Sequence, residues 1–456
     1  MLLGKGSTAA FAAAILRAAG YRVAVYSSPH AAHVSERFQS GAGGAAISRA
    51  DFEALVAANA DAVSNAQAAC GGALTHFEVT TALALRHFAD VAPDCAVVEV
   101  GLGGAADATN VFSPYNLEAA VITTLDKEHT AALGNSIAAI ARAKAGILRE
   151  GRPGIISPAQ RPAAAAALRA LSRQSRCLPF DFRRMRLRFD AALVPTADGV
   201  AQPGALSVRY TPAGWDDVAA VVRGGFVSRL VGAHQAGNLA AAVAAVVAMA
   251  EGGPSDARKA DAKRRNIPPE WRVPASAFGD GIAAAALPGR FFVSRSPDHS
   301  GPTLVADGAH SPAAALALAS ALRLPLRDGA AFAPLALVVA MAADKDAAAM
   351  FDALAPLLPV SVVATRVAIA GSSARAADPA ALAAAWGAAV QRSSSSSGGS
   401  CAADVADGLE DAIARAARAV GPAGTVVVTG SLHAAWAAQE ALRQKGRAAL
   451  FGLNGA

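Results

Sequence analysis

The sequence predicts an α/β protein whose first large domain is a doubly wound parallel sheet. Short apolar runs, partly β-branched and bounded by turn residues, recur along the chain, and alanine-rich helical stretches separate them. This alternation is typical of a parallel sheet with helices on both faces. Polar residues directly follow several of these runs, and the ligands of such a sheet bind at the carboxyl ends of its strands.

Composition narrows the class of protein. The chain has 456 residues, which is long enough for two or three domains with buried cores. The net charge of +6 is spread thinly and forms no dense basic stripe, so we expect no nucleic-acid partner. No apolar run is long enough to cross a bilayer, so we expect no membrane partner. The four cysteines form no CxxC pair, which argues against a zinc site and fits a reducing compartment.

In the first half of the chain, strands and helices are predicted to alternate. The expected strands are Val23–Tyr26, Cys95–Val100, Ala119–Thr124 and Gly154–Ser157. The expected helices are Asp51–Ala69, Phe77–Phe88 and Ile137–Leu148. Each strand is a short, mainly apolar and partly β-branched run, as expected when both faces of a sheet are covered.

The pattern then changes twice. Residues 173–229 form short alternating runs, among them Met185–Phe189 and Leu206–Tyr210, which predict a small antiparallel insertion before a helix over Gln235–Ala250. Residues 251–286 are rich in glycine, proline and charge and are interpreted as a loop or disordered insertion. A second α/β unit is predicted from strands at Thr303–Val305, Leu335–Ala340, Val360–Thr365 and Thr425–Val428.

The N-terminus carries a partial phosphate-binding loop, Gly4-Lys5-Gly6-Ser7-Thr8, followed by a helical stretch. A glycine-rich turn at a helix N-terminus aims backbone N–H groups at phosphate oxygens. Lys5 would reach the outer phosphates and Ser7 would lie near magnesium. The GxxxxGK[ST] pattern is incomplete, because its first glycine is absent and Gly6 separates Lys5 from Ser7. A glycine-rich tail before a surface helix is the alternative. Since such a loop normally follows a strand, we expect that sequence preceding it is missing.

Three polar residues near strand ends form a candidate cation site. Ser28 follows the first strand, Glu99 lies near the end of the second within EVGLGGAADATN, and His129 follows the third. Hydroxyl, carboxylate and imidazole groups can together bind a divalent cation. Taken singly, Ser28 could be a turn cap, Glu99 could belong to an ordinary strand-to-loop turn, and His129 could be a structural histidine.

Further polar residues occur in GAHQAGN, LPGR, DGAH and GSLH. Arg290 could clamp a phosphate. Lys144, in contrast, is an ordinary solvated helix lysine when judged on propensity alone.

The ordered motifs GKGST, YSSPH, FEVTT, EVGLGGAADATN, HTAALG, AKAGI, GAHQAGN, LPGR, DGAH and TGSLH resemble the folylpolyglutamate synthase/dihydrofolate synthase family. These are Mur-ligase-like, ATP-dependent amide-bond ligases. The resemblance runs from Gly4 to about His433 and is greatest to the dihydrofolate synthases of plants and green algae. It implies a P-loop ATPase domain over residues 1–286, truncated at its N-terminus, a linker over 287–302, and a smaller Rossmann-like glutamate-ligase domain over 303–456.

The resemblance also implies roles for matching positions. ATP would be held by Gly4, Lys5, Gly6, Ser7, Asn238, Arg290 and Asp307, with Asn238 at the adenine and Asp307 at the ribose. Magnesium would be held by Ser28, Glu99 and His129, and a second ion by Lys144 in a carbamylated form. The pterin substrate would lie at Phe77, Glu78, Ala106 and Asp107, and the glutamate end near His310 and Ser431. Lys5, Lys144, His129 and His310 would be the catalytic residues.

The implied reaction joins L-glutamate to dihydropteroate through an acyl phosphate. Two alternatives stay open: a folylpolyglutamate synthase acting on tetrahydrofolate, and a non-catalytic nucleotide- or folate-binding relative with a damaged P-loop. A monomer and a mitochondrial or cytoplasmic location are expected.

Overall fold

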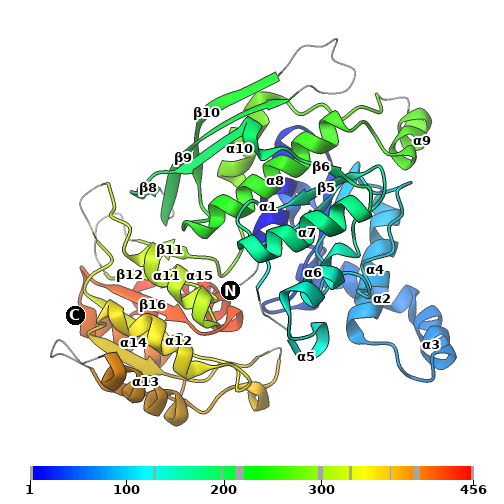
Figure 1. The fold of residues 1–456 in the computed structure, drawn as a ribbon. Helices are drawn as coiled ribbons and strands as arrows, with labels where there is room; N and C mark the ends of the chain where they lie inside the picture. The colour runs from blue at the N-terminus through cyan, green and yellow to red at the C-terminus, as the bar shows by residue number, and fades with distance from the viewer. Residues whose placement is uncertain are drawn as a thin grey trace.

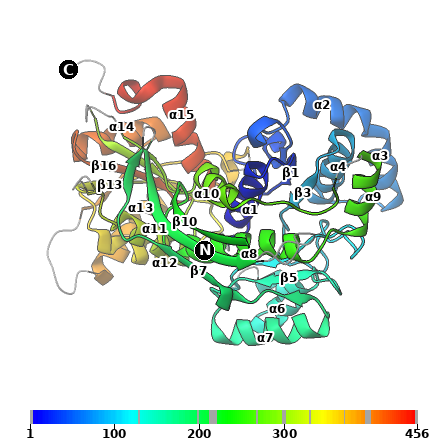
Figure 2. The same ribbon diagram turned by 90° about the horizontal axis from the view of Figure 1, so that it is seen from above.

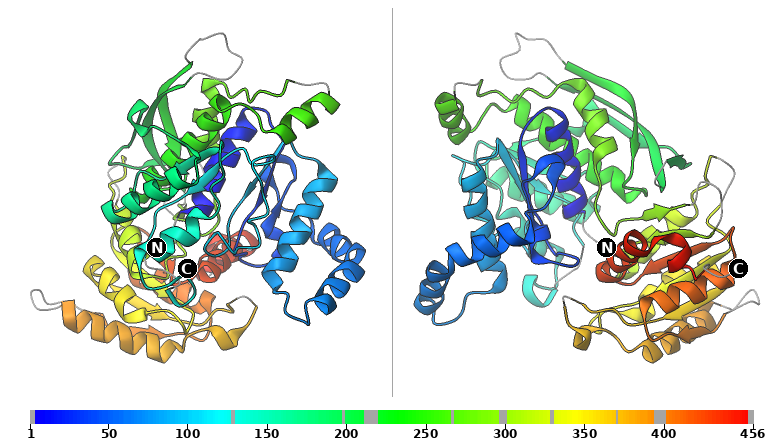
Figure 3. Two further views of the ribbon diagram at one scale, coloured as in Figure 1. Left: turned by 45° about the vertical axis from the view of Figure 1, so that its right-hand side comes forward. Right: turned by 180° about the vertical axis from the view of Figure 1, so that it is seen from behind.

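The structure is a computed structural model that describes residues 4–126, 130–196, 199–210, 220–265, 268–295, 301–327, 331–369, 371–393 and 401–452. Two α/β lobes lie side by side (Figure 1). The elements from α1 to α10 are called the N-terminal lobe, and the chain from Gly289 onward, with the elements from β11 to α15, the C-terminal lobe. The rear view in Figure 3 separates the lobes, whereas in the view from above in Figure 2 the green strands of the N-terminal lobe overlap the C-terminal lobe.

The N-terminal lobe begins with a small three-stranded sheet in the order β2-β1-β3. Its strands are β1 (Val23–Tyr26), β2 (Phe38–Gln39) and β3 (Cys95–Val98), and β1 and β3 run parallel. Its helices are α1 (Lys5–Ala18), α2 (Arg49–Ala58), α3 (Ala60–Ala69) and α4 (His76–Val91). The predicted strands at Val23–Tyr26 and Cys95–Val100 are therefore confirmed.

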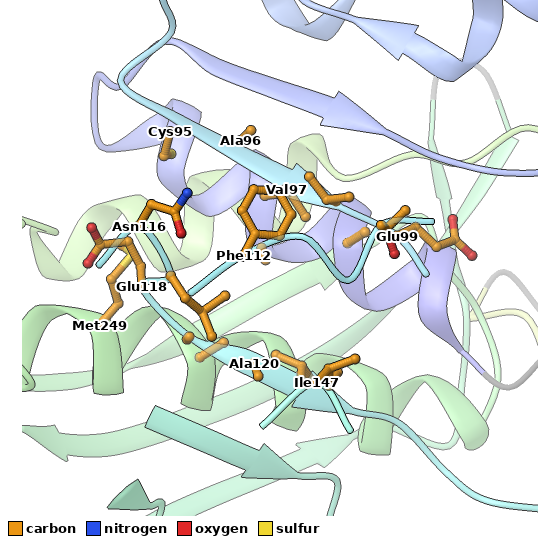
Figure 4. Close-up of a pocket in the computed structure, with 18 of the residues that line it drawn as sticks. Cys95, Ala96, Val97, Glu99, Phe112, Asn116, Glu118, Ala120, Ile147 and Met249 are labelled. Atoms are coloured by element: carbon orange, nitrogen blue, oxygen red, sulfur yellow. The ribbon is translucent and has the colours of Figure 1, made fainter. Parts of the chain in front are cut away.

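A second three-stranded sheet, entirely parallel, continues the lobe in the order β4-β5-β6. Its strands are β4 (Ala120–Ile122), β5 (Pro153–Ile156) and β6 (Leu178–Pro179). The helices α5 (Thr130–Leu133), α6 (Ile137–Ala145) and α7 (Pro162–Gln174) belong to this part. The sheet expected to be continuous is thus divided into two parts, with β3 and β4 as the facing edges (Figure 4).

The predicted antiparallel insertion is confirmed. It comprises β7 (Met185–Phe189), β8 (Val194–Thr196), β9 (Gly199–Tyr210) and β10 (Ala220–Ser228). Helix α8 (His234–Glu251) follows and is buried along most of its length. It packs beside α1 in the main core of the lobe.

The interpretation of residues 251–286 as a loop or disordered insertion is wrong. The segment contains α9 (Asp256–Arg265) and α10 (Ala275–Ala284). Helix α9 is anchored by Arg258, whose side chain is only 6% exposed and lies over the ring of Trp271. Helix α10 is anchored by Gly281, which packs directly against the backbone of Ile15 in α1. Burial of Arg258 and Gly281 stabilises these two helices, although the composition of the segment is typical of a loop.

The C-terminal lobe is a six-stranded sheet in the order β11-β12-β16-β13-β14-β15. The strands are β11 (Phe292–Ser294), β12 (Thr303–Ala306), β13 (Leu335–Val339), β14 (Ser361–Ala364), β15 (Ala403–Val405) and β16 (Thr425–Thr429). All pairs are parallel except β11 with β12. The helices are α11 (Pro312–Leu322), α12 (Ala347–Leu354), α13 (Pro379–Ser393), α14 (Leu409–Val420) and α15 (Leu432–Leu450). Strand β11 lies within the predicted linker, and the predicted division into domains stays a prediction.

No single helix in the described ranges combines the length and apolar character needed to cross a bilayer. Helices α8 and α9 reach both only as a pair, which is bent by 66°.

Candidate active site between the lobes

The start of α1 is built as an anion site. Gly4 has a left-handed backbone with φ 74°, and a Cβ at this position would overlap the side-chain oxygen of Asn238. Only glycine avoids both the backbone strain and the overlap. The first N–H groups of a helix have no partner within the helix, and the first turn of α1 carries no acidic residue. The arrangement favours a phosphate at this end.

Lys5 and Glu99 meet beside this helix start. The Lys5 Nζ donates to the Gly101 carbonyl oxygen at 3.0 Å. The Ser28 N–H donates to Glu99 Oε2 at 3.3 Å. A Cβ on Gly6 would lie 3.6 Å from the same carboxylate oxygen. The predicted residues Lys5, Gly6, Ser28 and Glu99 are therefore brought together.

Glu99 is a buried carboxyl group, 8% exposed. Burial raises its pKa to about 7, although Lys5, the Ser28 N–H, Arg290 and Arg37 all oppose the shift. A hard cation beside a phosphate site would stabilise the ionised form, and carboxylate and hydroxyl oxygens are the ligands that Mg²⁺ prefers. Glu99 and Ser28 thus fit magnesium.

These two residues do not form a complete metal cage. Within the described part of the chain, no group of three or more His, Cys, Asp and Glu side chains is placed to hold an ion. Mg²⁺ commonly takes one or two carboxylates together with phosphate and water oxygens, so two protein ligands suffice. His129, the third predicted ligand, lies outside the described residues.

A pocket at the junction of the lobes gathers the remaining predicted ATP contacts. Its polar lining includes Ser7 and Asn238 from the N-terminal lobe and Arg290 and Asp307 from the C-terminal lobe. Its apolar wall is formed by α11, which contributes Ala314, Ala317, Leu318 and Ala321. Residues far apart in the sequence therefore face one small cavity.

Asp307 is fixed in place at the end of β12. Its carboxylate accepts from the Phe291 N–H at 2.8 Å and from the Ala309 N–H at 2.9 Å. Burial raises its pKa, while Arg290 and these two donors lower it. Burial likewise lowers the pKa of Arg290, and the carboxylates of Asp307 and Glu99 oppose that shift. Arg290 thus lies in the field of acidic groups from both lobes.

The glycine-rich loop after β3 packs against the end of α6. The Ala105 N–H donates to the Ala143 carbonyl oxygen at 2.7 Å. A Cβ on Gly104 would lie 2.9 Å from that same oxygen, so the approach requires glycine. This contact carries Lys144 to a cavity that Lys5 and Glu99 also line. Helix propensity alone did not predict that Lys144 lines this cavity. The carbamylation of Lys144 stays a prediction.

The predicted pterin residues differ in their surroundings. The Phe77 ring lies against Gly101, where a Cβ would be 2.5 Å from the ring edge. The Asp107 carboxylate accepts from the Leu102 N–H, the Thr109 N–H and the Thr109 hydroxyl, at 2.7, 3.0 and 2.5 Å. Asp107 therefore holds its own loop in shape.

The two other pterin positions face solvent. Glu78 is exposed and forms a capping box with Thr75 at the start of α4. Ala106 is also exposed. Contact of these four residues with a pterin stays a prediction.

His310 and Ser431 lie in the turns that follow the adjacent strands β12 and β16. The His310 Nδ1 is 2.9 Å from the Gly308 carbonyl oxygen, which fixes the proton on Nδ1. Burial lowers the pKa of His310 and keeps the ring neutral. The Ser431 hydroxyl accepts from the Ala434 N–H at 3.1 Å. Their role toward glutamate stays a prediction.

Sequence reasoning missed Arg37 and gave His30 no role. The Arg37 Nε donates to His30 Nδ1 at 2.9 Å. Burial, followed by the charge of Arg37, lowers the pKa of His30 to about 4. Arg37 also contributes to the field at Glu99. No motif marked Arg37, whereas the position of His30 after the first strand was a usable signal.

The chain matches two domain families, the Mur ligase middle domain over residues 62–246 and the Mur ligase glutamate ligase domain over residues 289–432. It is 34% identical over 395 residues to the dihydrofolate synthase/folylpolyglutamate synthase of Mycobacterium tuberculosis, covering 84% of this chain and 72% of the relative. It is also 34% identical over 316 residues to a probable bifunctional folylpolyglutamate synthase/dihydropteroate synthase of Halobacterium salinarum. That match covers 69% of this chain, which spans only 33% of the longer archaeal protein.

Solved structures give the same result. The folylpolyglutamate synthase of Mycobacterium tuberculosis, complexed with ADP and AMPPCP, superposes with a TM-score of 0.72 at 29% identity, covering 97% of this chain and 90% of that one. Escherichia coli FolC in complex with DHPP and ADP gives 0.70 at 26%, covering 97% and 87%. A bifunctional enzyme with Mn, AMPPNP and L-glutamate bound gives 0.66 at 25%, covering 96% and 87%. From its sequence matches and its fold, the chain belongs to the dihydrofolate synthase/folylpolyglutamate synthase family.

Proposed function

We propose that the protein is an ATP-dependent ligase that joins L-glutamate to dihydropteroate. The observation that carries the proposal is the convergence at the lobe junction. The start of α1, with Ser7, and Asn238 come from one lobe, and Arg290 and Asp307 come from the other. A site that needs both lobes suits a reaction in which ATP must meet two further substrates.

The chemistry has two steps. A carboxylate oxygen of dihydropteroate attacks the γ-phosphorus of ATP, giving an acyl phosphate and ADP. The glutamate amine then attacks the acyl carbon, and the tetrahedral intermediate expels phosphate as the amide forms. Negative charge grows on the transferred phosphoryl group in the first step. We assign Lys5, Arg290 and the N–H groups at the start of α1 to stabilise this charge.

Magnesium would be held by Glu99 and Ser28, with a second ion at carbamylated Lys144. When bound, the ions would neutralise phosphate charge and polarise the phosphoryl oxygens. His310 is the residue we assign to receive a proton from the glutamate ammonium. Its Nδ1 proton is committed to Gly308, so Nε2 is the basic atom.

Substrate choice rests on the resemblance and on the relatives. The relatives carry both activity names, and the Escherichia coli protein was solved with DHPP, which supports a pterin acid as acceptor. Elongation of tetrahydrofolate is the second candidate because it uses the same ATP chemistry. We further propose a monomer and a mitochondrial or cytoplasmic location. The affinity to plant and algal enzymes also stays a prediction.

The test is a ligase assay with each acceptor. Purified protein, Mg²⁺, ATP and L-glutamate are incubated with dihydropteroate or with tetrahydrofolate, and the glutamylated product is measured by mass spectrometry. We expect product with dihydropteroate and glutamate-dependent release of ADP. Product from tetrahydrofolate alone would assign the elongating activity instead. No product with either acceptor, while nucleotide still binds, would favour the non-catalytic relative.

Lys5→Ala should lower turnover by about 100-fold or more, because it removes the charge nearest the transferred phosphoryl group. The variant should still fold, because among the described residues the Lys5 side chain donates a single hydrogen bond, to the Gly101 carbonyl oxygen. Lys445→Ala is the matched control, since Lys445 is exposed and pairs with Glu410 at 2.7 Å in the other lobe. Near-normal turnover of the Lys5 variant would contradict the assignment.

A further inference from the structure

Strand β10 forms one edge of the antiparallel sheet in the N-terminal lobe, at the outside of the molecule (Figure 1). It is nine residues long, and β9 is the one described strand that pairs with it. A long edge strand presents a row of backbone N–H and C=O groups that no other strand uses. An extended peptide can bind such an edge as an additional strand.

The hydrogen bonds of β9 show which backbone groups of β10 point outward. The Pro203 carbonyl oxygen of β9 accepts from the Asp190 N–H at 2.8 Å, so the backbone of Pro203 faces β7. Pro203 is paired with Val227 of β10, and backbone direction alternates along antiparallel strands. The N–H and C=O groups of Val227, Gly225 and Arg223 therefore point away from β9. We call the outward backbone of these three residues the β10 edge.

The space beside the β10 edge is open. Arg223 and Val227 are exposed. A Cβ on Gly224 would have no atom within 4 Å, and a Cβ on Gly225 would meet only the Gly204 carbonyl oxygen, at 3.7 Å. The described residues around these two glycines therefore leave room for another backbone.

Three arginines gather on the outer face of the same sheet. Ser207 of β9 lies opposite both Arg186 of β7 and Arg223 of β10. Arg209 is two residues from Ser207 and so lies on the same face. All three arginines are exposed, whereas the opposite face of the sheet packs in the main core of the lobe. We call Arg186, Arg209 and Arg223 the arginine face; the sequence scatters them, and strand pairing brings them together.

The arginine face has no acidic partner among the described residues. The Arg186 Nη1 donates to the carbonyl oxygens of Arg183 and Met185, at 2.8 and 3.1 Å. The side chains of Arg209 and Arg223 form no hydrogen bond or ion pair with a described residue. These two are diagonal neighbours on adjacent strands, about 7–8 Å apart, where like charges destabilise a sheet. A carboxylate between them would relieve this repulsion.

We propose that the β10 edge docks an extended acidic segment of a partner protein as an additional strand. The backbone of the segment would pair with the outward groups of Arg223, Gly225 and Val227. Side chains along a strand alternate between its two faces, so every second side chain of the segment would lie beside the arginine face. Aspartate or glutamate at these positions would pair with Arg223 and Arg209, because a guanidinium group binds a carboxylate through two parallel hydrogen bonds.

Two observations favour an acidic polypeptide over other partners. A nucleic acid could neutralise the arginines, but it would leave the β10 edge unpaired. The described exposed residues of this face also include no aromatic side chain on which a base could stack. A second copy of this chain supplies no carboxylate from the same strand, because Ala220–Ser228 contains no acidic residue. Pairing of two β10 strands would instead add further arginines to a face that already lacks acidic partners.

The test uses fluorescent peptides of about six residues, the usual length of a strand. One peptide alternates glutamate and valine, a second has the same composition with its three glutamates consecutive, and a third alternates lysine and valine. A uridine hexanucleotide is the comparison for general attraction of anions. Binding to the full chain is measured by anisotropy at about 0.15 M salt, where long-range charge effects are largely screened.

We expect the alternating acidic peptide to bind, and the peptide with consecutive glutamates to bind about tenfold more weakly. Arg223→Gln and Arg209→Gln should each weaken binding of the alternating peptide by about tenfold, because each removes a charged hydrogen-bond donor. Arg169→Gln is the matched control, since Arg169 is exposed on α7 in another part of the lobe. It should leave the affinity unchanged.

Hydrogen exchange tests the pairing of the backbone. The bound peptide should slow exchange at the amides of Arg223, Gly225 and Val227 by about tenfold or more. The amides of Val222 and Phe226, which already face β9, should change little and serve as the internal control.

Equal binding of the peptide with consecutive glutamates or of the hexanucleotide, without protection of the β10 edge, would overturn the proposal. Absence of binding by every probe would also overturn it and leave Arg223 as a charge that keeps other strands away. None of these measurements depends on ligase activity, so failure here is distinguishable from failure of the proposed function.

Discussion

At the scale of single residues, Glu99 is the most informative group in the site. It is buried beside Gly6 and accepts from the Ser28 N–H, and its pKa is raised to about 7. A carboxyl group in such a place costs stability whenever it is ionised without a cation. A cation bound beside the phosphates of ATP would remove this cost, in keeping with the proposed role of Glu99 as a magnesium ligand.

This cost predicts a pH dependence in the metal-free protein. The carboxyl group has an ordinary pKa of 4.5 and a folded pKa of about 7, so the folded state holds more protons between these values. Stability should therefore fall as pH rises from 4.5 to 7 and level off above 7. Glu99→Gln removes this contribution and should be more stable than the wild type by about 3 kcal/mol at pH 8, with little difference at pH 4.5.

The measurement is urea unfolding in EDTA at several pH values. Glu53→Gln serves as the control because Glu53 is exposed on α2. Parallel stability curves for the wild type and the Glu99 variant would show that Glu99 is not a strained buried acid.

At the scale of elements, the approach of α10 to α1 shows why composition misled the sequence interpretation. Gly279 and Gly281 resemble loop residues in the printed sequence. In the structure Gly281 is the point where α10 meets the backbone of Ile15. The glycine that argued against a helix is the residue that lets this helix pack.

A matched pair of substitutions within α10 tests this contact. Gly281→Ala should destabilise the protein by about 2 kcal/mol, because a Cβ there would overlap Ile15 Cα and lie 2.6 Å from its nitrogen. Gly279→Ala should stabilise it by about 0.5 kcal/mol, because nothing lies within 4 Å of its Cβ position and alanine favours a helix. The free energies of unfolding in urea provide the comparison. Equal effects of the two substitutions would contradict the packing described for α10.

Other elements were predictable where pattern and environment agree. The apolar runs at Val23–Tyr26 and Leu335–Ala340 became buried strands because parallel sheets cover both faces. Helix α9 was not predictable, because its charged sequence hides the buried positions Arg258 and Ala262. The predicted helix over 51–69 is divided at Asn59, whose φ of −114° and ψ of 8° are not helical.

At the scale of the whole molecule, spacing in the sequence says little about the site. Residues such as Ser7, Asn238 and Asp307 meet only because the two lobes fold against one another. The residue types indicated phosphate and cation binding. That these residues come together was implied only by the family resemblance, and the structure places them around one pocket.

The lobe junction leads to the central claim, which is that ATP activates a substrate carboxylate at this site. Isotope transfer tests it most directly. Dihydropteroate labelled with ¹⁸O in its carboxylate is turned over with ATP and L-glutamate, and the released phosphate is analysed by mass spectrometry. Since the carboxylate oxygen stays on phosphorus when the amide forms, each phosphate should carry one labelled oxygen. Unlabelled phosphate accompanying amide product would contradict the acyl phosphate and with it the proposed chemistry.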